Sequence, residues 1–423
     1  MNQNNDSLQP WQKTFYKSYG IIRLHEEISD FCEYVQPTPL EDAVRNHVLN
    51  KVKSVLSTKW PLIEVHLFGS FATGLYLPTS DIDIVVFGKW KKLPLWDVEK
   101  LLQQNGISKD IRVIDKASVP IVKFIDEETG YQVDISFNKD NGIKSIPMIK
   151  DYLKRFSNLK KLYMVLKQFM LQRDLNEVWT GGISSYCLML LCISFLQNYN
   201  RNYNGEINLG CLLMEFFELY GRCFNYFNSA IYVTKSGGYR IKLDKSVGEK
   251  SSIITIDDPI DKDNDVAKSC YGLFNIRHAF SHAYCLLYSK VAPICMIDNN
   301  GDCEIPMNQS ILGSIINLSK NSIVFRQRIQ SEFARFVNFE AAKLEFRLPV
   351  CESLDISSDW AKETVTPKVY KRRSPRKSGK AVNNLPMKSK QPKKINKARD
   401  LNDLVQWSNE NVFKNSAFFH NNI

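Results

Sequence analysis

Two aspartates separated by one residue are the first feature of this sequence that could do chemistry. Asp81 and Asp83 stand at the start of the apolar segment DIDIVVF, which is expected to form a strand. Side chains alternate along a strand, so both carboxylates would project from the same face. Two such carboxylates repel each other unless a cation lies between them, and hard oxygen ligands suit Mg²⁺ or Mn²⁺. The pair therefore predicts a divalent metal site.

A third carboxylate could complete this site. Asp134 lies in YQVDISF, another apolar segment that is expected to form a strand. A charge in such a strand costs free energy unless it is paired or bound to a metal. Together, Asp81, Asp83 and Asp134 would support two-metal phosphoryl transfer. One ion would lower the pKa of an attacking 3′-hydroxyl, and the other would bind a triphosphate and its leaving group.

A Gly-Ser pair lies about ten residues before the two aspartates. Gly69 and Ser70 follow a predicted strand and open a predicted helix. The backbone N–H groups of such a turn, with a helix N-terminus behind them, favour a phosphate. Each feature alone is common, because many Gly-Ser pairs are turns and many Asp-x-Asp pairs end surface strands. Their combination in this order predicts a nucleotidyltransferase active site.

Alternating apolar residues predict the sheet that would position these side chains. Residues 57–140 are expected to form a small α/β domain with a mixed sheet. Two helices, over 24–34 and 39–56, are predicted to precede it. The elements expected inside the domain are strands over 63–68, 82–87, 111–114, 119–125 and 131–137, and a helix over 97–104.

The pattern becomes helical from residue 146. Helices are predicted over 160–171, 184–197, 211–220 and 275–288, with two more over 311–339 and a loop or hairpin over 229–256. The fold class expected is therefore α+β. The expected domains are a flexible N-terminus (1–20), N-terminal helices packing on the central domain (21–56), a catalytic domain (57–145), a helical domain (146–350) and a disordered basic tail (351–423).

Composition is consistent with a folded protein of two domains and a tail. The chain has 423 residues, of which 44% are hydrophobic. Its first residues are polar rather than signal-like, and its longest apolar run, 186–196, is too short to span a bilayer. We expect a soluble intracellular protein without a membrane partner. The ten cysteines form no Cys-x-x-Cys pair, so they are interpreted as small hydrophobic residues.

Positive charge is concentrated near the C-terminus. The chain carries a net charge of +11, and residues 361–400 hold fourteen Lys or Arg against two acidic residues. This segment has too few large apolar residues to fold, and a flexible cationic tail binds phosphate backbones without reading sequence. We expect RNA binding, nuclear import or both; a tail that only aids solubility is the other interpretation. The densest cluster is Lys371, Arg372, Arg373, Arg376 and Lys377.

Several segments resemble a known family. The Gly-Ser turn followed by Asp-x-Asp is similar to the signature of the DNA-polymerase-β-type nucleotidyltransferases. Within that superfamily, LFGSFATGLYLPTSDIDIVVFGKW, VDISFN, LKQFMLQRDLNEVWTGGISSY and EFFELYGRCFNYF resemble the nuclear poly(A) polymerases of RNA-surveillance (TRAMP-type) complexes. This family is also called the topoisomerase-related-function or DNA polymerase sigma family. The resemblance covers about residues 20–290 and implies a polymerase-β-like palm.

The resemblance also implies roles for individual residues. Asp81, Asp83 and Asp134 match the metal-binding catalytic carboxylates. The positions that match nucleotide-contacting residues are Gly69, Ser70, Gly142, Lys167, Asn176, Ser185, Tyr186, Asn264 and Lys268. Among them, Lys167 and Ser185 would contact phosphate and Tyr186 would stack on the base. Lys268 stands where relatives usually carry Arg; it keeps the charge but loses the planar fork.

The implied activity is addition of AMP from ATP to RNA 3′ ends, with two Mg²⁺ or Mn²⁺ ions. The implied partners are a zinc-knuckle RNA-binding protein and an RNA helicase, and the implied location is the nucleus or nucleolus, with a cytoplasmic pool left open. A terminal uridylyltransferase would share the three aspartates. Such enzymes often carry His near the recognition loop, but residues 258–272 contain none, although His278 is close. A catalytically silent RNA-binding scaffold fits the tail, yet it has no need for three carboxylates in apolar strands.

Overall fold

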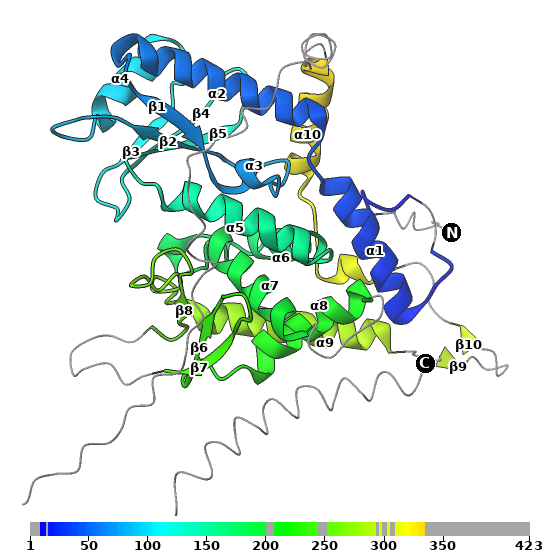
Figure 1. Ribbon diagram of the computed structural model, residues 1–423. Coiled ribbons are helices and arrows are strands. Elements are labelled where there is room, and N and C mark those ends of the chain that lie inside the picture. Colours follow the sequence, from blue (N-terminus) through cyan, green and yellow to red (C-terminus); the bar gives the residue numbers. More distant parts are fainter. Residues whose placement is uncertain are drawn as a thin grey trace, which may run out of the picture. The chain divides into compact units, whose positions relative to one another are not determined.

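The computed structural model describes residues 9–13, 16–199, 207–242, 252–292, 296–297, 303–304 and 309–334 (Figure 1). Only the backbone is described for 296–297 and 303–304, which form the short strands β9 (Met296–Ile297) and β10 (Cys303–Glu304). The basic tail expected over 351–423, with its cluster at Lys371–Lys377, lies outside the described residues. So do residues 1–8 of the segment expected to be a flexible N-terminus.

A five-stranded mixed sheet forms the first core. Its strands lie in the order β1-β2-β5-β4-β3, and β2 runs parallel to β5 while the other neighbours are antiparallel. The central pair is rich in buried Ile and Val, as expected for strands covered on both faces. The bounds are β1 (Glu64–Leu67), β2 (Ile82–Phe87), β3 (Ile111–Ile114), β4 (Ile121–Ile125) and β5 (Gln132–Phe137).

Three helices share this core with the sheet: α2 (Pro39–Lys59), α4 (Leu95–Gln104) and α10 (Lys320–Glu332). Figure 1 shows α2 running alongside the strands. α2 begins with a capping box in which Thr38 and Glu41 satisfy each other's backbone N–H groups. Its apolar stripe, Val44, Val48, Val52 and Leu56, is fully buried against the sheet.

A second core is built from helices. It contains α1 (Gly20–Val35), α5 (Asn141–Arg155), α6 (Leu159–Leu171), α7 (Ser185–Tyr199), α8 (Leu209–Glu218) and α9 (Leu273–Val291). α7 is buried from Cys187 to Gln197, which explains its apolar run on every face. Cys187 and Cys192 lie inside this helix as buried residues, as expected.

The segment predicted as a loop or hairpin is a small sheet. Strands β6 (Ser229–Tyr232) and β7 (Gly238–Ile241) form the hairpin, and β8 (Ile256–Asp257) pairs parallel to β6. Short helical turns connect the larger elements. They are α3 (Gly69–Thr73), the 3₁₀ turns Val178–Thr180 and Leu312–Ser314, and the π-helical turn Leu219–Cys223. None of the described helices combines the length and apolar character needed to cross a membrane.

Two elements pack differently from the expectation. Both N-terminal helices, 21–56, were expected on the helical domain, but only α1 packs there, against α6 and α8. α2 packs on the sheet, because its valine stripe continues the buried face of the strands. α10 falls within the segment expected to be helical domain, 146–350, yet it buries Ile329 in the sheet core. Helix α5 begins at Asn141, before the expected boundary at 145.

Candidate active site

The three aspartates lie together at the two central strands. Asp83 of β2 is the parallel partner of Asp134 in β5, and Asp81 directly precedes β2. Burial, together with the charges of Asp134 and Asp81, raises the pKa of Asp83 to about 7, although Lys167 and Lys123 oppose this shift. Burial also raises the pKa of Asp134 to about 6. The fold therefore crowds three carboxylates together, which favours a bound cation or proton.

Lys123 is the cation that contacts this group, and sequence analysis missed it. It lies on β4 opposite Asp134, and its Nζ is 3.0 Å from Asp81 Oδ2 and 3.2 Å from Asp134 Oδ2. Burial alone would lower the pKa of Lys123, but the two carboxylates outweigh it and raise the pKa. A lysine between the buried Val122 and Phe124 was the available signal, because a charge in an apolar strand needs a partner.

The aspartates offer ligands that suit a hard divalent ion. Asp134 Oδ1 is buried and has no hydrogen-bond partner, so it retains a free acceptor. Within the described residues no group of three or more acidic, His or Cys side chains is arranged to hold a metal ion by itself. Mg²⁺ sites of this kind commonly use one or two carboxylates and take further oxygens from substrate phosphates. The residues present therefore fit metal binding together with a triphosphate.

Gly69 is held directly against the aspartates. The backbone N–H of Phe68 donates to the Asp83 carbonyl at 3.1 Å, which fixes the turn onto β2. Gly69 has a φ of +66°, and a Cβ there would lie 2.1 Å from Asp83 Oδ2. Gly142, in the first turn of α5, would place a Cβ 2.5 Å from the Phe68 ring. The expected glycines thus allow close packing around the turn, while the helix that Ser70 was expected to open is only five residues long.

Arg45 of α2 supports the loop that carries Asp81. Its side chain is fully buried, and its Nη2 donates to the carbonyls of Ser80 at 2.8 Å and Pro78 at 3.2 Å. The guanidinium lies 4.2 Å from the ring centroids of both Tyr76 and Tyr131. Sequence analysis placed Arg45 in a helix and assigned it no role. The contacts show that it fixes the backbone before β2 from behind.

Lys167 of α6 joins the helical core to this site. Its Nζ donates to the Leu75 carbonyl at 3.0 Å. Burial lowers its pKa to about 8, and the nearby charges of Asp83 and Asp81 oppose that shift. A lysine ammonium has three N–H donors, so two remain for phosphate oxygens after the bond to the Leu75 carbonyl. The structure therefore places Lys167 beside the aspartates, as its expected contact with a triphosphate requires.

Two of the expected nucleotide-binding residues meet at Asp258. The Tyr186 hydroxyl donates to Asp258 Oδ1 at 3.0 Å, and Asn264 Nδ2 donates to Asp258 Oδ2 at 2.8 Å. Asp258 was placed in the recognition loop by sequence but given no role. Ser185 and Lys268 are exposed, and no described contact joins their side chains to the aspartates.

Asn176 lies on the loop that follows α6. Its Nδ2 donates to Glu177 Oε1 at 3.2 Å. The Glu177 charge acts to raise the pKa of Asp134, so this loop lies within electrostatic reach of the aspartates. The loop therefore belongs to the surroundings of the site.

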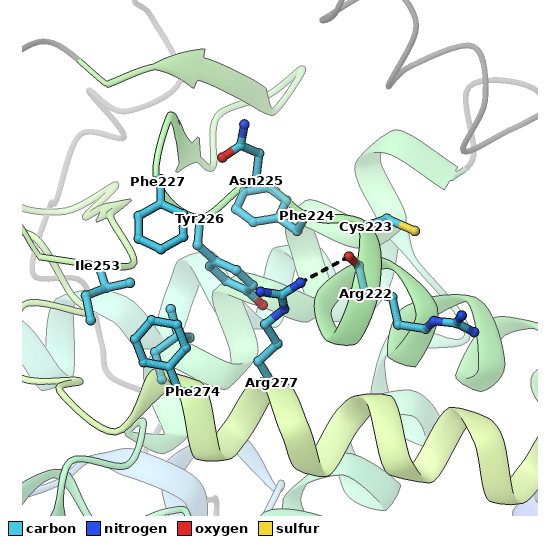
Figure 2. Close-up of a pocket in the computed structure, with 10 residues that line it drawn as sticks. Arg222, Cys223, Phe224, Asn225, Tyr226, Phe227, Ile253, Phe274 and Arg277 are labelled. Carbon is cyan, nitrogen blue, oxygen red and sulfur yellow. Dashed lines mark hydrogen bonds between the residues drawn. The ribbon is translucent and has the colours of Figure 1, made fainter.

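A separate pocket of about 210 Å³ lies in the helical core near the start of α9 (Figure 2). Figure 2 shows the Arg277 side chain directed at the Arg222 carbonyl, with Phe227 and Phe274 on the other side of the pocket. The two phenyl rings have centroids 6.4 Å apart. None of the residues expected in the catalytic site lines this pocket.

Parts of the chain match two described protein families. Residues 24–154 match the family described as poly(A) RNA polymerase, mitochondrial-like, central palm domain. Residues 208–264 match the Cid1 family of poly A polymerases. The first region contains the three aspartates, and the second contains Asp258 and Asn264.

Curated relatives extend the match. The chain is 35% identical over 326 residues to the poly(A) RNA polymerase cid14 of Schizosaccharomyces pombe, and 34% identical over 304 residues to poly(A) RNA polymerase protein 2 of Saccharomyces cerevisiae. These matches cover 74% and 69% of this chain, and 47% and 51% of the relatives. The chain thus spans about half the length of these two relatives.

A relative of similar length is described as inactive. Trf4-2 of Drosophila melanogaster, an inactive poly(A) RNA polymerase protein, is 35% identical over 363 residues. The match covers 82% of this chain and 85% of that protein. Sequence similarity at this level therefore occurs with an inactive protein as well as with named polymerases.

Solved structures share the fold. The polymerase core of TRAMP, an RNA surveillance complex, is 30% identical, with a TM-score of 0.65 over 74% of this chain and 100% of that chain. A structure of the Cid1 poly(U) polymerase is 22% identical, with a TM-score of 0.56 over 64% of this chain and 96% of that chain. The α+β fold with a palm and a helical domain, expected from sequence, is confirmed.

Proposed function

Since the chain belongs to the TRAMP-type family of poly(A) RNA polymerases, also called the topoisomerase-related-function family, we propose that it adds AMP from ATP to RNA 3′ ends without a template. The observation that carries this proposal is the group of Asp81, Asp83 and Asp134 with Lys167 beside it. A purely structural sheet gains nothing from three crowded carboxylates, because their mutual repulsion costs stability.

Asp81, Asp83 and Asp134 would hold two Mg²⁺ or Mn²⁺ ions. When bound, these ions would stabilise charge on the attacking 3′-oxygen of the RNA and on the oxygen that leaves with pyrophosphate as AMP is transferred. Lys167 would neutralise a triphosphate oxygen with its remaining N–H groups. Gly69 and Ser70 would bring backbone N–H groups near the phosphates, since the turn is fixed to β2.

Tyr186 and Asn264 would recognise the nucleotide. The Tyr186 ring is half-buried and its hydroxyl is fixed by Asp258, so the ring is held in one orientation for stacking on a base. Asn264 is fixed by the same carboxylate. Ser185, Asn176 and Lys268 would complete the contacts to phosphate, ribose and base. The recognition loop, 258–272, contains no His, which supports adenine over uracil.

Primer extension tests the proposal. Purified protein, a labelled oligo-RNA and Mg²⁺ or Mn²⁺ are mixed with each nucleoside triphosphate separately. We expect extension with ATP in the wild type and none in the Asp81→Ala/Asp83→Ala variant. Main use of UTP would retain the mechanism and replace the substrate. Failure to extend with any nucleotide, even with added partner subunits, would favour a silent scaffold such as the inactive relative suggests.

Three further features of the proposal concern the cell. We propose that the protein acts with a zinc-knuckle RNA-binding subunit and an RNA helicase, because its family relatives include the TRAMP core. Its basic segment, 361–400, would add a sequence-independent grip on RNA and direct the protein to the nucleus. Co-purification without either partner would contradict the first point, and exclusion of a tagged full chain from the nucleus would contradict the last.

A further inference from the structure

Two exposed aromatic residues lie together beside the candidate active site. The Trp179 side chain is 78% exposed and Tyr271 is 67% exposed, although burial of such rings would contribute favourable free energy. Trp179 lies in the 3₁₀ turn Val178–Thr180 that follows α6, and Tyr271 directly precedes Gly272, the N-cap of α9. The Tyr271 hydroxyl nevertheless donates to the Trp179 carbonyl at 2.8 Å. The fold thus brings two exposed aromatic residues from distant parts of the chain into contact, through the hydroxyl of Tyr271 and the backbone of Trp179.

The backbone under these rings is fixed by hydrogen bonds. The Gly272 N–H donates to the Gly181 carbonyl at 2.9 Å, and the Gly182 N–H donates to the Glu177 carbonyl at 2.9 Å. Gly181 has a φ of +90°, and a Cβ there would lie 2.6 Å from the Tyr271 ring. The Tyr271 ring therefore rests on a residue that has no side chain. Both rings are exposed on a fixed support, and such preorganisation favours binding.

The support lies between Lys167 and Tyr186 in the chain, and the bond from Gly272 joins it to the end of the recognition loop, 258–272. Glu177, two residues before Trp179, acts electrostatically on Asp134. Asn176, which is expected to contact the nucleotide, precedes Glu177. A ligand on Trp179 would therefore lie near the reacting groups. The charges of the loop indicate which kind of ligand it would be. Residues 174–182 carry Asp174 and Glu177 but no Lys or Arg, so the loop attracts an uncharged ring face better than a phosphate.

We propose that Trp179 and Tyr271 form a stacking platform for a base near the 3′ end of the RNA primer. This inference rests on the proposed function. A primer must shift by one nucleotide after each addition, which requires an open and sequence-tolerant contact, and stacking on aromatic rings supplies that. The ATP base is expected at Tyr186, whose ring is half-buried and whose hydroxyl is fixed. The two bases would thus use different rings.

The test separates primer from nucleotide. Trp179→Ala is compared with Trp179→Phe, which keeps a ring, and with Trp96→Ala, which removes a 52%-exposed indole from α4 in the other core. We expect Trp179→Ala to raise the KM for RNA about 5- to 150-fold, since base–aromatic stacking has that range. The KM for ATP should change less than twofold. Trp179→Phe should restore most of the loss, and Trp96→Ala should behave as wild type.

RNA primers with one abasic position locate the stacked base. In the wild type, one position among the last few nucleotides should lose RNA affinity by a factor similar to that of Trp179→Ala. The abasic primer and the variant together should lose little more than either alone, because both remove the same contact. RNA affinity measured by fluorescence anisotropy without nucleotide keeps this test separate from activity. An inactive wild type would contradict the proposed function and leave this measurement to decide the platform.

Two outcomes would overturn the platform. A raised KM for ATP with unchanged RNA affinity would assign the rings to the incoming nucleotide. Unchanged values for both substrates would assign them to no part of the reaction, and a partner protein would then be the remaining occupant.

Discussion

Gly69 shows how closely single residues are constrained beside the aspartates. Because Gly69 has no side chain, Asp83 Oδ2 can lie only 2.1 Å from the position that a Cβ of residue 69 would take. We predict that Gly69→Ala lowers the turnover of nucleotide addition by 100-fold or more, an order of magnitude typical of small displacements of catalytic groups (about 10²-fold). The expected cause is displacement of Asp83, and rates of primer extension under saturating substrates measure it.

Gly74 supplies the matched control for this variant. It ends the same short helix, α3, and has a similar φ of +70°, but nothing lies within 4 Å of its Cβ position. Gly74→Ala should therefore share the backbone cost, about 1 kcal/mol, and retain turnover. Equal loss of activity in both variants would mean that strain in the turn, rather than contact with Asp83, is responsible.

Lys123 carries a prediction about metal and stability. Lys123→Met removes the cation that contacts Asp81 and Asp134. We expect the metal-free protein to lose about 1–2 kcal/mol of unfolding free energy, a value reduced from that of fully buried pairs because these side chains are partly exposed. Added Mn²⁺ should then raise the Tm of the variant more than that of the wild type, because a bound cation replaces the missing charge.

Lys109→Met is the control, since it removes a surface ion pair to Glu127 from side chains that are 88% and 50% exposed. It should cost no more than about 1 kcal/mol, with an unaltered response to Mn²⁺. A Lys123→Met protein with wild-type stability and an identical response to Mn²⁺ would contradict the role of Lys123 as counterion.

The sequence predicted those charged residues whose spacing is explained by metal binding. Strand alternation predicted that Asp81 and Asp83 share a face, and Asp134 was the candidate third carboxylate on another strand. The structure pairs Asp83 with Asp134 on neighbouring strands and places Asp81 directly before β2. Lys123, Arg45 and Asp258 were missed because each has a partner that is distant in sequence, namely Asp81, Ser80 and Tyr186. The contact between Lys123 and Asp81, for example, depends on β4 pairing with β5, which no local pattern specifies.

At the scale of elements, α2 supports the loop before Asp81 through Arg45. We predict that Arg45→Lys lowers the unfolding free energy by about 2–3 kcal/mol and slows nucleotide addition, because a lysine cannot bond several carbonyls and pack between Tyr76 and Tyr131 at once. Urea unfolding and primer extension measure the two effects. Arg112→Lys, on an exposed part of β3, should change neither by a measurable amount.

A loss of stability in Arg45→Lys without any loss of turnover would mean that the loop before β2 holds its conformation unaided. Wild-type stability would contradict the structural role as well. The two measurements therefore distinguish support of the catalytic loop from general packing.

Element types were predicted well, and element partners less well. The five strands were placed within two residues of their bounds, because their apolar runs are short and separated by polar turns. The partners of α2 and α10 were not predictable, since an apolar stripe does not specify which core it will join. The predicted helix 211–220 included only the first two residues of the π-helical turn Leu219–Cys223 and did not distinguish it from α-helix.

At the scale of the whole molecule, the charge of segment 361–400 carries a prediction from sequence alone. Deleting it should weaken RNA binding and reduce its dependence on salt. The slope of log K against log salt concentration should become shallower by about 0.7 for each phosphate that the segment neutralises on single-stranded RNA. Binding constants measured over a range of salt concentrations test this. A chain of the same length in which these Lys and Arg are Gln is the control. An unchanged salt slope would mean that the segment does not bind RNA.

Within the described residues, the order of helices and strands crosses between the two cores three times, and Leu75 and Leu77 of the loop before β2 also pack in the helical core. The chain leaves the helical core after α1, returns to it after β5, and leaves again between the Leu312–Ser314 turn and α10. Arg326 of α10 ties the first and last passages together, since it donates to the carbonyls of Tyr34 and Gln36 and to Glu41.

The sheet core is consequently not encoded by one continuous stretch of the sequence. A recombinant fragment confined to residues 39–155 would lack α10, and the Tyr131 ring would no longer pack edge-to-face on Phe325. Such a fragment, transferred alone into another protein, would lack part of its hydrophobic core. A transplantable version would need α10 joined by a new linker, and recombination during evolution would have faced the same requirement.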